Sequence, residues 1–495
     1  MYTLVEPKRK GKFPAPVLPV EKRRASFCEV QLSYTPEEVI EEAQRCLLCG
    51  NPACMDACPV QLDVRGMNEA VSRGDFATAY RRIRETNPLL GTCARVCPQL
   101  DGLCEAACHL NVIGEPIAVG MIQRFVADWE RNGHPQPLPS IGKDTGKRVA
   151  VIGAGPAGLA AAELLRRYGH AVTIYEQSRH AGGTAWYGIP DYHLSKDVLQ
   201  YEIDQIRRMG VEIKTGISVG KDVTLSELLQ DGADAVLIAT GAKDVTPLMI
   251  PGSDLGGVID GYRFLEDVFM EGVQNYLRQP KYDLGNKVLV IGGGDSAIDS
   301  ARTALRLTNG EVTIMYRRTA KELPAYPLVV SEAQEEGVKF RFLVEPKAFN
   351  GVNGRLVSAT FSVMKLGEPD SSGRRRPVPT GEEITVECSS VIIAIGRGPN
   401  TSIQSREKIR MNERGAIIVD EKFMTSMPGV FAAGDVTTGE TLVVKAAAAG
   451  RQAAQRIHEY LMGLEDKHVS LYDRYFRNKS YYNMLYGIEE GPPPP

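Results

Sequence analysis

The sequence predicts an α/β protein in which a helical, cysteine-rich domain precedes two Rossmann-like nucleotide-binding domains. Two observations support this prediction. Eight of the ten cysteines fall between residues 46 and 108, and two apolar strands, at 147–152 and 287–291, each run into a glycine-rich turn and a helix. The length of 495 residues agrees with about three domains.

Changes in composition along the chain set the expected boundaries. The first helix is expected to begin after Thr35, a capping residue followed by Pro36 and two glutamates. The Pro- and Gly-rich stretch 132–146 predicts a linker. We therefore expect four segments: a helical domain over 1–145, the first part of one nucleotide-binding domain over 146–285, a second nucleotide-binding domain over 286–410, and the rest of the first with a C-terminal tail over 411–495.

Composition excludes several classes of function. The chain has 58 Lys and Arg against 61 Asp and Glu, a net charge of -3, whereas a dedicated nucleic-acid binder would be strongly basic. It has neither an apolar run long enough for a transmembrane helix nor an amino-terminal secretory signal. We expect a cytoplasmic protein without a nucleic-acid or membrane partner.

The clustered cysteines indicate iron–sulfur binding. They follow the pattern Cys-x2-Cys-x4-Cys-x3-Cys-Pro and then Cys-x3-Cys-Pro-x5-Cys-x3-Cys, and such runs can share ligands between two clusters. Structural zinc is the alternative, but zinc ribbons pair two close Cys-x2-Cys knuckles and this chain has one. A third interpretation is unligated cysteine. The isolated Cys28 and Cys388 are expected to be small buried apolar residues.

The first glycine-rich turn predicts a dinucleotide site. Gly153, Gly155 and Gly158 follow an apolar strand, and Glu176 ends the next strand, where a carboxylate can accept hydrogen bonds from ribose hydroxyls. The helix that follows the turn offers free N–H groups to a pyrophosphate. Gly183 and Gly241, in two later glycine-containing turns, are expected to line the same site.

The stretch 429–436 favours FAD over NAD(H) in this first site. Gly434 and Asp435 end a strand, so that Asp435 could bind a ribityl chain. The helix after Thr441 would direct the positive end of its dipole at the flavin ring and stabilise the reduced, anionic flavin. The alternative for Asp435 is an ordinary helix cap.

The second glycine-rich turn predicts an NADP(H) site. Gly292, Gly294 and Ala297 repeat the motif, and Asp295 lies inside the turn, where it could position the nicotinamide half. Arg317 and Arg318 stand where Glu176 stands in the first fold, and guanidinium groups suit a 2′-phosphate. The alternative is that both arginines are solvated strand-end residues.

These motifs together resemble the small chain of NADPH-dependent glutamate synthase and its relatives. The relatives include the large subunit of NADH-dependent reduced ferredoxin:NADP oxidoreductase and the amino-terminal part of dihydropyrimidine dehydrogenase. The resemblance covers nearly the whole chain and implies a glutathione-reductase-like arrangement, in which the NADPH domain interrupts the FAD domain. Two features depart from the family pattern: His193 stands where arginine is usual, and six residues separate Cys97 from Cys104.

The resemblance also implies two [4Fe–4S] clusters bound in crossed fashion. The first cluster would be held by Cys46, Cys49, Cys54 and Cys108. The second would be held by Cys58, Cys97, Cys104 and Gln123, with an exposed helix residue as the alternative for Gln123. Cys93 is then left over and is expected to be unligated.

The expected activity is electron transfer from NADPH through FAD and both clusters to a partner subunit, as in glutamate synthase, with no conventional catalytic residue. The partner would be a larger glutamate synthase subunit, a small FAD/[2Fe–2S] subunit or ferredoxin, in a hetero-oligomer. Transhydrogenation between ferredoxin and NADP is the alternative role. A NADPH-binding redox sensor or scaffold is an alternative of another class, and a disulfide reductase is disfavoured because the stretch after Glu176 has no redox cysteine pair.

Overall fold

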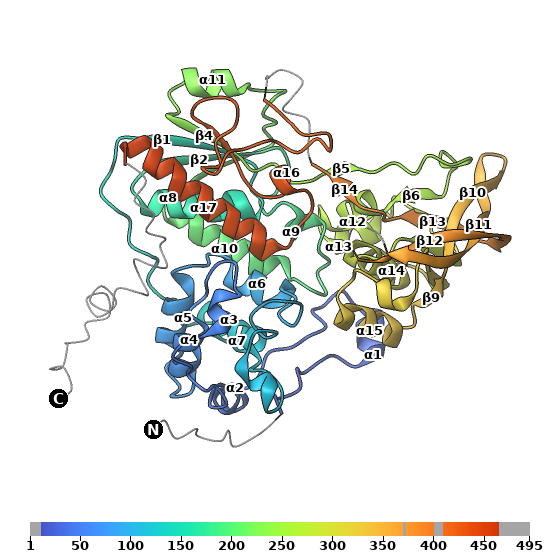
Figure 1. The fold of residues 1–495 in the computed structure, drawn as a ribbon, viewed down its shortest axis with the longest axis horizontal. Helices are drawn as coiled ribbons and strands as arrows, with labels where there is room; N and C mark the ends of the chain where they lie inside the picture. Colours follow the sequence, from blue (N-terminus) through green and yellow to red (C-terminus); the bar gives the residue numbers. More distant parts are fainter. Residues whose placement is uncertain (1–10, 370–372, 400–408, 465–495) are drawn as a thin grey trace.

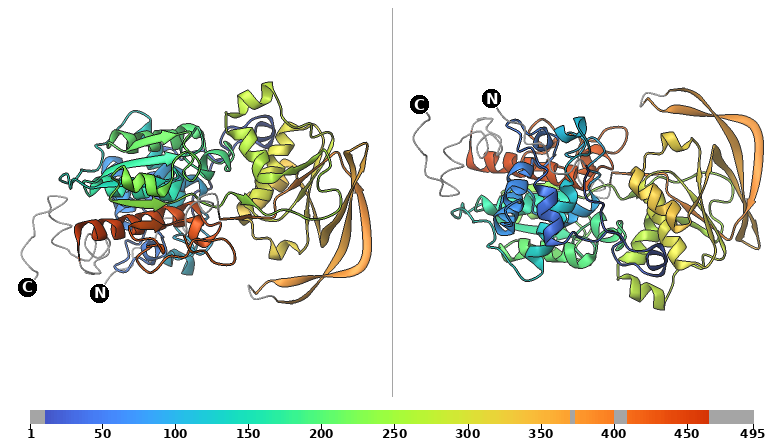
Figure 2. Two further views of the ribbon diagram at one scale, coloured as in Figure 1. Left: turned by 90° about the horizontal axis from the view of Figure 1, so that it is seen from above. Right: turned by 90° about the horizontal axis from the view of Figure 1, so that it is seen from below.

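A computed structural model of the chain describes residues 11–369, 373–399 and 409–464 (Figure 1). The expected C-terminal tail lies outside these residues from 465 onward. The described chain forms two lobes, and both views in Figure 2 show a long antiparallel hairpin on the outer side of the second lobe. The expected α/β class, with a helical domain before two Rossmann-like units, is confirmed.

The cysteine-rich segment is helical, with short helices separated by the cysteine-bearing turns. The helix expected after Thr35 is present, and Thr35 and Glu38 form a reciprocal capping box at its start. The elements are α1 (Val20–Ala25), α2 (Pro36–Ala43), α3 (Ala53–Asp56), α4 (Val64–Val71), α5 (Phe76–Arg84), α6 (Leu90–Val96), the 3₁₀ turn η1 (His109–Val112) and α7 (Val119–Arg131).

The first nucleotide-binding unit is a five-stranded parallel sheet in the order β15-β4-β1-β2-β3. Its strands are β1 (Arg148–Ile152), β2 (Ala171–Glu176), β3 (Glu212–Thr215), β4 (Ala235–Ile238) and β15 (Val430–Ala432). Its helices are α8 (Pro156–Arg167), α9 (Thr184–Tyr187), α10 (Lys196–Arg208), α11 (Leu225–Gln230), α16 (Asp435–Thr438) and α17 (Val443–Met462). Because β15 pairs with β4, the chain returns to this sheet after the second unit has been completed.

The second unit is also a five-stranded parallel sheet, in the order β6-β13-β7-β8-β9. Its strands are β6 (Val258–Asp260), β7 (Lys287–Ile291), β8 (Glu311–Tyr316), β9 (Lys339–Phe342) and β13 (Ser390–Ile393). Its helices are α12 (Gly261–Phe269), α13 (Val273–Arg278), α14 (Asp295–Leu307), η2 (Ala320–Glu322) and α15 (Pro327–Glu336). The chain enters this sheet at β6, before the boundary expected at residue 286.

Two smaller sheets complete the second unit and its connection to the first. The hairpin is formed by β11 (Arg355–Pro369) and β12 (Arg375–Glu387). With β10 (Val344–Val352), which pairs with β11, it makes a three-stranded antiparallel sheet. The link between the units is a two-stranded antiparallel sheet of β5 (Asp244–Val245) and β14 (Arg397–Gly398). This narrow link therefore lies where the chain leaves the first unit and where it comes back.

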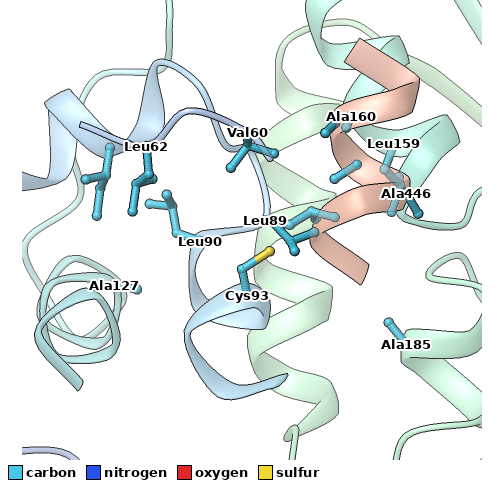
Figure 3. Packing of buried hydrophobic residues seen from close by; sticks show 14 of the residues in the cluster. Val60, Leu62, Leu89, Leu90, Cys93, Ala127, Leu159, Ala160, Ala185 and Ala446 are labelled. Carbon is cyan, nitrogen blue, oxygen red and sulfur yellow. The ribbon is translucent and has the colours of Figure 1, made fainter. Parts of the chain in front are cut away.

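One hydrophobic core joins the cysteine-rich helices to the first unit. Figure 3 shows Leu89, Leu90 and Cys93 of the cysteine-rich domain in the same cluster as Leu159 and Ala160 of α8. The amino-terminal strap, residues 11–34, instead reaches the second unit: Arg23 of α1 is buried, and its Nη1 lies 2.7 Å from Glu335 Oε2. The continuous core fixes the cysteine groups relative to the first nucleotide site.

Candidate functional site

One large cavity lies where the three parts of the chain meet. Its volume is 590 Å³. Its lining includes Cys97 and Pro98 from the cysteine-rich domain, the glycine turn and Glu176 of the first unit, Asp435 and Thr441 from the returning segment, and Asp295 and Ser296 from the second unit. Residues from all four expected segments therefore face the same space.

The first glycine turn has the close contacts that its motif requires. Gly153 has φ of +102°, and a Cβ there would lie 2.4 Å from the carbonyl oxygen of Ala239. A Cβ on Gly158 would lie 2.0 Å from the carbonyl oxygen of Gly153, so only glycine allows α8 to pack this closely on the turn. Gly155 is the N-cap residue of α8, directly opposite Gly183.

Glu176 closes the same turn from the end of β2. Its Oε2 accepts a hydrogen bond of 2.8 Å from the backbone N–H of Ala154, and its Oε1 accepts one of 2.8 Å from Ser178. The side chain is 3% exposed and lines the cavity. These two donors fix the carboxylate where a ribose of a dinucleotide would lie.

Asp435 provides the test of whether FAD fits this cavity. Its Oδ1 is buried and has no hydrogen-bond partner among the described residues, and burial raises the pKa of its carboxyl to about 7. A buried acceptor without a partner is costly, and a ribityl hydroxyl in the cavity would satisfy it. Thr441, just before the 20-residue helix α17, lines the cavity beside Asp435, so the residues present fit a flavin.

The second glycine turn opens α14 in the same way. Gly292 has φ of +145°, and a Cβ there would lie 2.1 Å from the carbonyl oxygen of Ala394. Gly294 caps α14, and Ala297 is fully buried behind the turn. Asp295 Oδ1 accepts a hydrogen bond of 2.9 Å from the Tyr326 N–H, and burial raises its pKa. This aspartate is therefore fixed at the cavity wall.

Arg317 and Arg318 lie just past the end of β8, outside the lining of the cavity. Arg318 is 6% exposed, and its Nε donates a hydrogen bond of 2.8 Å to the carbonyl oxygen of Arg375 on the hairpin. Arg317 is exposed, and its Nη1 lies 3.2 Å from Glu345 Oε1. The two side chains are thus held differently, which the sequence motif did not indicate.

The thiols of Cys46, Cys49, Cys54 and Cys108 line one small pocket near the surface. Each of the four is partly exposed. Burial, together with the neighbouring thiols, raises the pKa of Cys54 to about 12, so this thiol would ionise only on binding metal. His109 Nδ1 lies 3.4 Å from Cys49 Sγ at the rim of the pocket.

A second group of thiols lies deeper, next to the cavity. Cys58 and Cys104 are buried, and both influence the pKa of Cys97, which lines the cavity. Cys93, which is expected to be unligated, lies with this group: it is 3% exposed, and its hydrogen bonding with Cys97 raises the pKa of Cys97. Cys93 lies on α6 and Cys97 caps its end, and this i, i+4 spacing could have indicated their contact.

Gln123 is buried on α7 beside the same group. Its exposure is 6%, and its Nε2 donates a hydrogen bond of 2.7 Å to the carbonyl oxygen of Leu90. This bond leaves the amide Oε1 as the atom that could face a ligand. Among the described residues, no group of three or more His, Cys, Asp or Glu side chains is arranged to hold a metal ion. The assignment of the cluster sites therefore comes from the cysteine motifs and not from a preformed metal site.

A buried acid from the first unit supports this second group. Glu202 of α10 accepts hydrogen bonds from the backbone N–H of Gly91 at 2.5 Å and from the Thr92 hydroxyl at 2.6 Å, at the start of α6. Burial raises the pKa of Glu202 to about 7, although these donors favour its ionised form. Because α6 ends at Val96, just before Cys97, Glu202 ties the position of Cys97 to the first unit.

The fold and the site together define a class: a pyridine-nucleotide-dependent flavoprotein with an attached iron–sulfur domain. Residues 147–452 match the family model of the pyridine nucleotide-disulphide oxidoreductases. Residues 23–134 match a model described as dihydropyrimidine dehydrogenase domain II, 4Fe-4S cluster. The chain therefore belongs to the pyridine nucleotide-disulphide oxidoreductase family and is an FAD-, NADP(H)- and [4Fe–4S]-dependent oxidoreductase.

Relatives place the chain more closely. It is 36% identical over 457 residues to the small chain of NADPH glutamate synthase of Escherichia coli strain K12, covering 90% of this chain and 96% of that one. The chain belongs to this small-chain family. It is 39% identical over 433 residues to the beta subunit of an NADP(+)-dependent formate dehydrogenase of Moorella thermoacetica, covering 82% of this chain but 60% of that one.

A solved structure shows the same fold. Mycobacterium tuberculosis FprA in complex with NADPH aligns with a TM-score of 0.52 at 20% identity, covering 64% of this chain and 84% of that one. In the part of this chain that the structure describes, no helix has the length and apolar character needed to span a membrane.

Proposed function

We propose that this chain is the electron-input subunit of a hetero-oligomeric enzyme, carrying electrons from NADPH through FAD and two [4Fe–4S] clusters to a partner subunit. The observation that carries the proposal is the shared cavity of 590 Å³. It is lined by Cys97, by residues of or next to both glycine turns, and by Asp435. NADPH and FAD held in this cavity, and a cluster held at its wall, would be close enough to pass electrons to one another within the protein.

The flavin, when bound, supplies the conversion between the electron pair of a nicotinamide and the single electrons that iron–sulfur clusters accept. The protein's own residues would bind FAD and orient it in the cavity. Gly153, Gly155 and Gly158 admit the pyrophosphate, with Gly183 and Gly241 beside them. Glu176 and Asp435 accept hydrogen bonds from the two sugar-like portions, and Thr441 stands at the start of α17.

The second unit would hold NADP(H). Gly292, Gly294 and Ala297 permit close approach at the start of α14, and Asp295 stands at the wall that faces the flavin site. Arg318 and Arg317 supply positive charge for the 2′-phosphate at the end of β8. Replacing both arginines should remove the preference for NADP(H) over NAD(H).

The two thiol groups define the proposed cluster sites. Cys46, Cys49, Cys54 and Cys108 would hold the cluster nearer the surface. Cys58, Cys97, Cys104 and the Gln123 amide oxygen would hold the cluster nearer the flavin, with Cys93 close by as an unligated neighbour. We keep the expected segments as a proposal, namely helical iron–sulfur residues 1–145, FAD-binding residues 146–285 and 411–495, and NADP(H)-binding residues 286–410. The exception is the boundary at 286, because β6 already belongs to the second sheet.

The partner would dock where the outer cluster comes nearest to the surface. Apolar side chains gather there without cover from the described residues: Leu48 is 39% exposed, Val112 86% and Ile113 53%. The glutamate synthase small chain is the relative whose length this chain matches, which supports a large glutamate-forming subunit as the partner. A small FAD/[2Fe–2S] subunit or ferredoxin is the alternative.

The test is anaerobic isolation of the native complex, followed by its reduction with NADPH. We expect a second, different subunit, bleaching of the flavin, and reduction of an acceptor on the partner only when both subunits are present. A glutaminase-bearing partner would support the glutamate-forming role, and a small FAD/[2Fe–2S] partner would support the ferredoxin role. A monomer that binds NADPH without turnover would overturn the proposal in favour of a sensor or scaffold.

A further inference from the structure

Five lysine and arginine side chains line the large cavity, and four of them have a carboxylate partner. Lys12 pairs with Glu105, Arg95 and Arg124 with Glu29, and Arg397 with Glu440. Lys243 has neither an ion pair nor a hydrogen bond to any described residue. Its positive charge is therefore available to a ligand in the cavity.

The contacts of Lys243 place it near the first glycine turn by two independent routes. Along the chain, Lys243 follows Ala239 and Thr240, which are the residues that touch Gly153. Across the cavity, the Lys243 Nζ lies 4.6 Å from the centre of the Tyr187 ring. Tyr187 ends the short helix α9, which starts just after Gly183, and Gly183 faces Gly155.

The Lys243 side chain is partly buried, and the charged groups that act on its ammonium group are Glu176, Glu266, Arg263 and Arg397. Burial lowers the pKa of Lys243, while the nearby carboxylates of Glu176 and Glu266 raise it. A partly buried cation without an ion partner is costly, and the group that would best offset this cost is an anion bound beside it. The pyrophosphate of a dinucleotide is the anion that the glycine turn is shaped to receive.

We infer that Lys243 binds the pyrophosphate of FAD, adding a side-chain cation to the backbone N–H groups of the first glycine turn. This inference rests on the proposed placement of FAD in the cavity. Lys243 also lies directly before β5, in the narrow link to the second unit. The pyrophosphate of NADP(H) has the same chemistry, so the experiment must separate the two sources.

The experiment compares the holoenzyme with Lys243→Met and Lys243→Arg, and uses Lys339→Met as the control because Lys339 is an exposed lysine on β9 of the second unit. Two dissociation constants are measured: that of FAD, from flavin retained on serial dilution, and that of NADP⁺, from perturbation of the flavin absorbance. Iron and acid-labile sulfide contents show whether each variant has folded with its clusters.

We expect Lys243→Met to weaken FAD binding roughly tenfold or more, Lys243→Arg to recover most of the loss, and the control to match the wild type. Iron, sulfide and NADP⁺ affinity should stay at wild-type values. Unchanged FAD and NADP⁺ affinities in Lys243→Met would overturn the inference, and weaker NADP⁺ binding with unchanged FAD would overturn the assignment to FAD. A wild-type protein without flavin would instead refute the proposed function itself.

Discussion

The two cysteine groups of the amino-terminal domain differ in their surroundings. All four thiols of the outer group are partly exposed and line a pocket of their own, beside exposed apolar side chains. The inner group is largely buried, and its Cys97 borders the flavin cavity. Under the proposed function, this difference implies an order: electrons from the cavity would reach the inner group first, and a partner would contact the outer group.

Breaking the inner group should have the largest effect. Cys97→Ala removes the thiol that lies at the cavity wall, so electrons should stop at the flavin. We expect NADPH-driven reduction of the partner's acceptor to fall roughly 100-fold or more, while dyes that take electrons directly from flavin still turn over. Steady-state assays with both acceptors measure this, and equal losses with both would count against the order of the groups.

Breaking the outer group should have a more selective effect. Cys54→Ala should lower the iron content from about eight to about four atoms per chain and stop delivery to the partner. The inner cluster should still accept electrons from NADPH, which electron paramagnetic resonance of the reduced protein would detect. Loss of both cluster signals in this variant would mean that the two groups do not act as separate sites.

A smaller change should tune the inner group without destroying it. Gln123→Glu would place a carboxylate where we propose a neutral amide ligand, and the added negative charge should lower the reduction potential of that cluster by roughly tens of millivolts. Cys93→Ala is the matched control, with unchanged iron content and potential. A cluster lost in Cys93→Ala but intact in Gln123→Ala would show that the fourth ligand is the thiol.

The smallest expected effect is on the pH dependence of stability, and it arises from Glu202, the buried acid beside the inner group. Burial raises the pKa of Glu202 to about 7, so the folded protein holds this proton more tightly than the unfolded chain. The corresponding stability is present below the ordinary glutamate pKa and is lost as the pH rises through about 7.

Thermal unfolding of the holoenzyme at pH 6 and pH 8.5 measures this loss. The wild type should lose stability of the order of 1 kcal/mol between these pH values relative to Glu202→Gln. Glu37→Gln, a change at an exposed glutamate of α2, should behave like the wild type. A Glu202→Gln variant with the same pH dependence as the wild type would remove this acid from the account.

Local motifs made the fold predictable from the sequence, and they name candidate residues for the site. The glycine turns, the acid after one and the arginines after the other are sequence-adjacent patterns, and so is the spacing of the cysteines. The confirmed features are the family, the fold class and the cofactors. The individual site residues and the boundaries stay predictions.

The features that the sequence did not reveal depend on contacts between distant segments. The start of α6, the helix that carries Cys93, is held by Glu202 of α10, more than 100 residues further along the chain. The strap carries Arg23 to Glu335, 312 residues away, and β6 joins the second sheet earlier than composition suggests. The lack of an ion partner at Lys243 depends on where carboxylates from distant segments lie, so the sequence does not show it.

The most direct test of the central claim is the metal and sulfide content of the protein purified without oxygen. We expect about eight iron atoms and about eight acid-labile sulfides per chain, together with one FAD. Zinc in place of iron, or iron without acid-labile sulfide, would contradict it, because no route for single electrons would then lead from the flavin cavity to the surface.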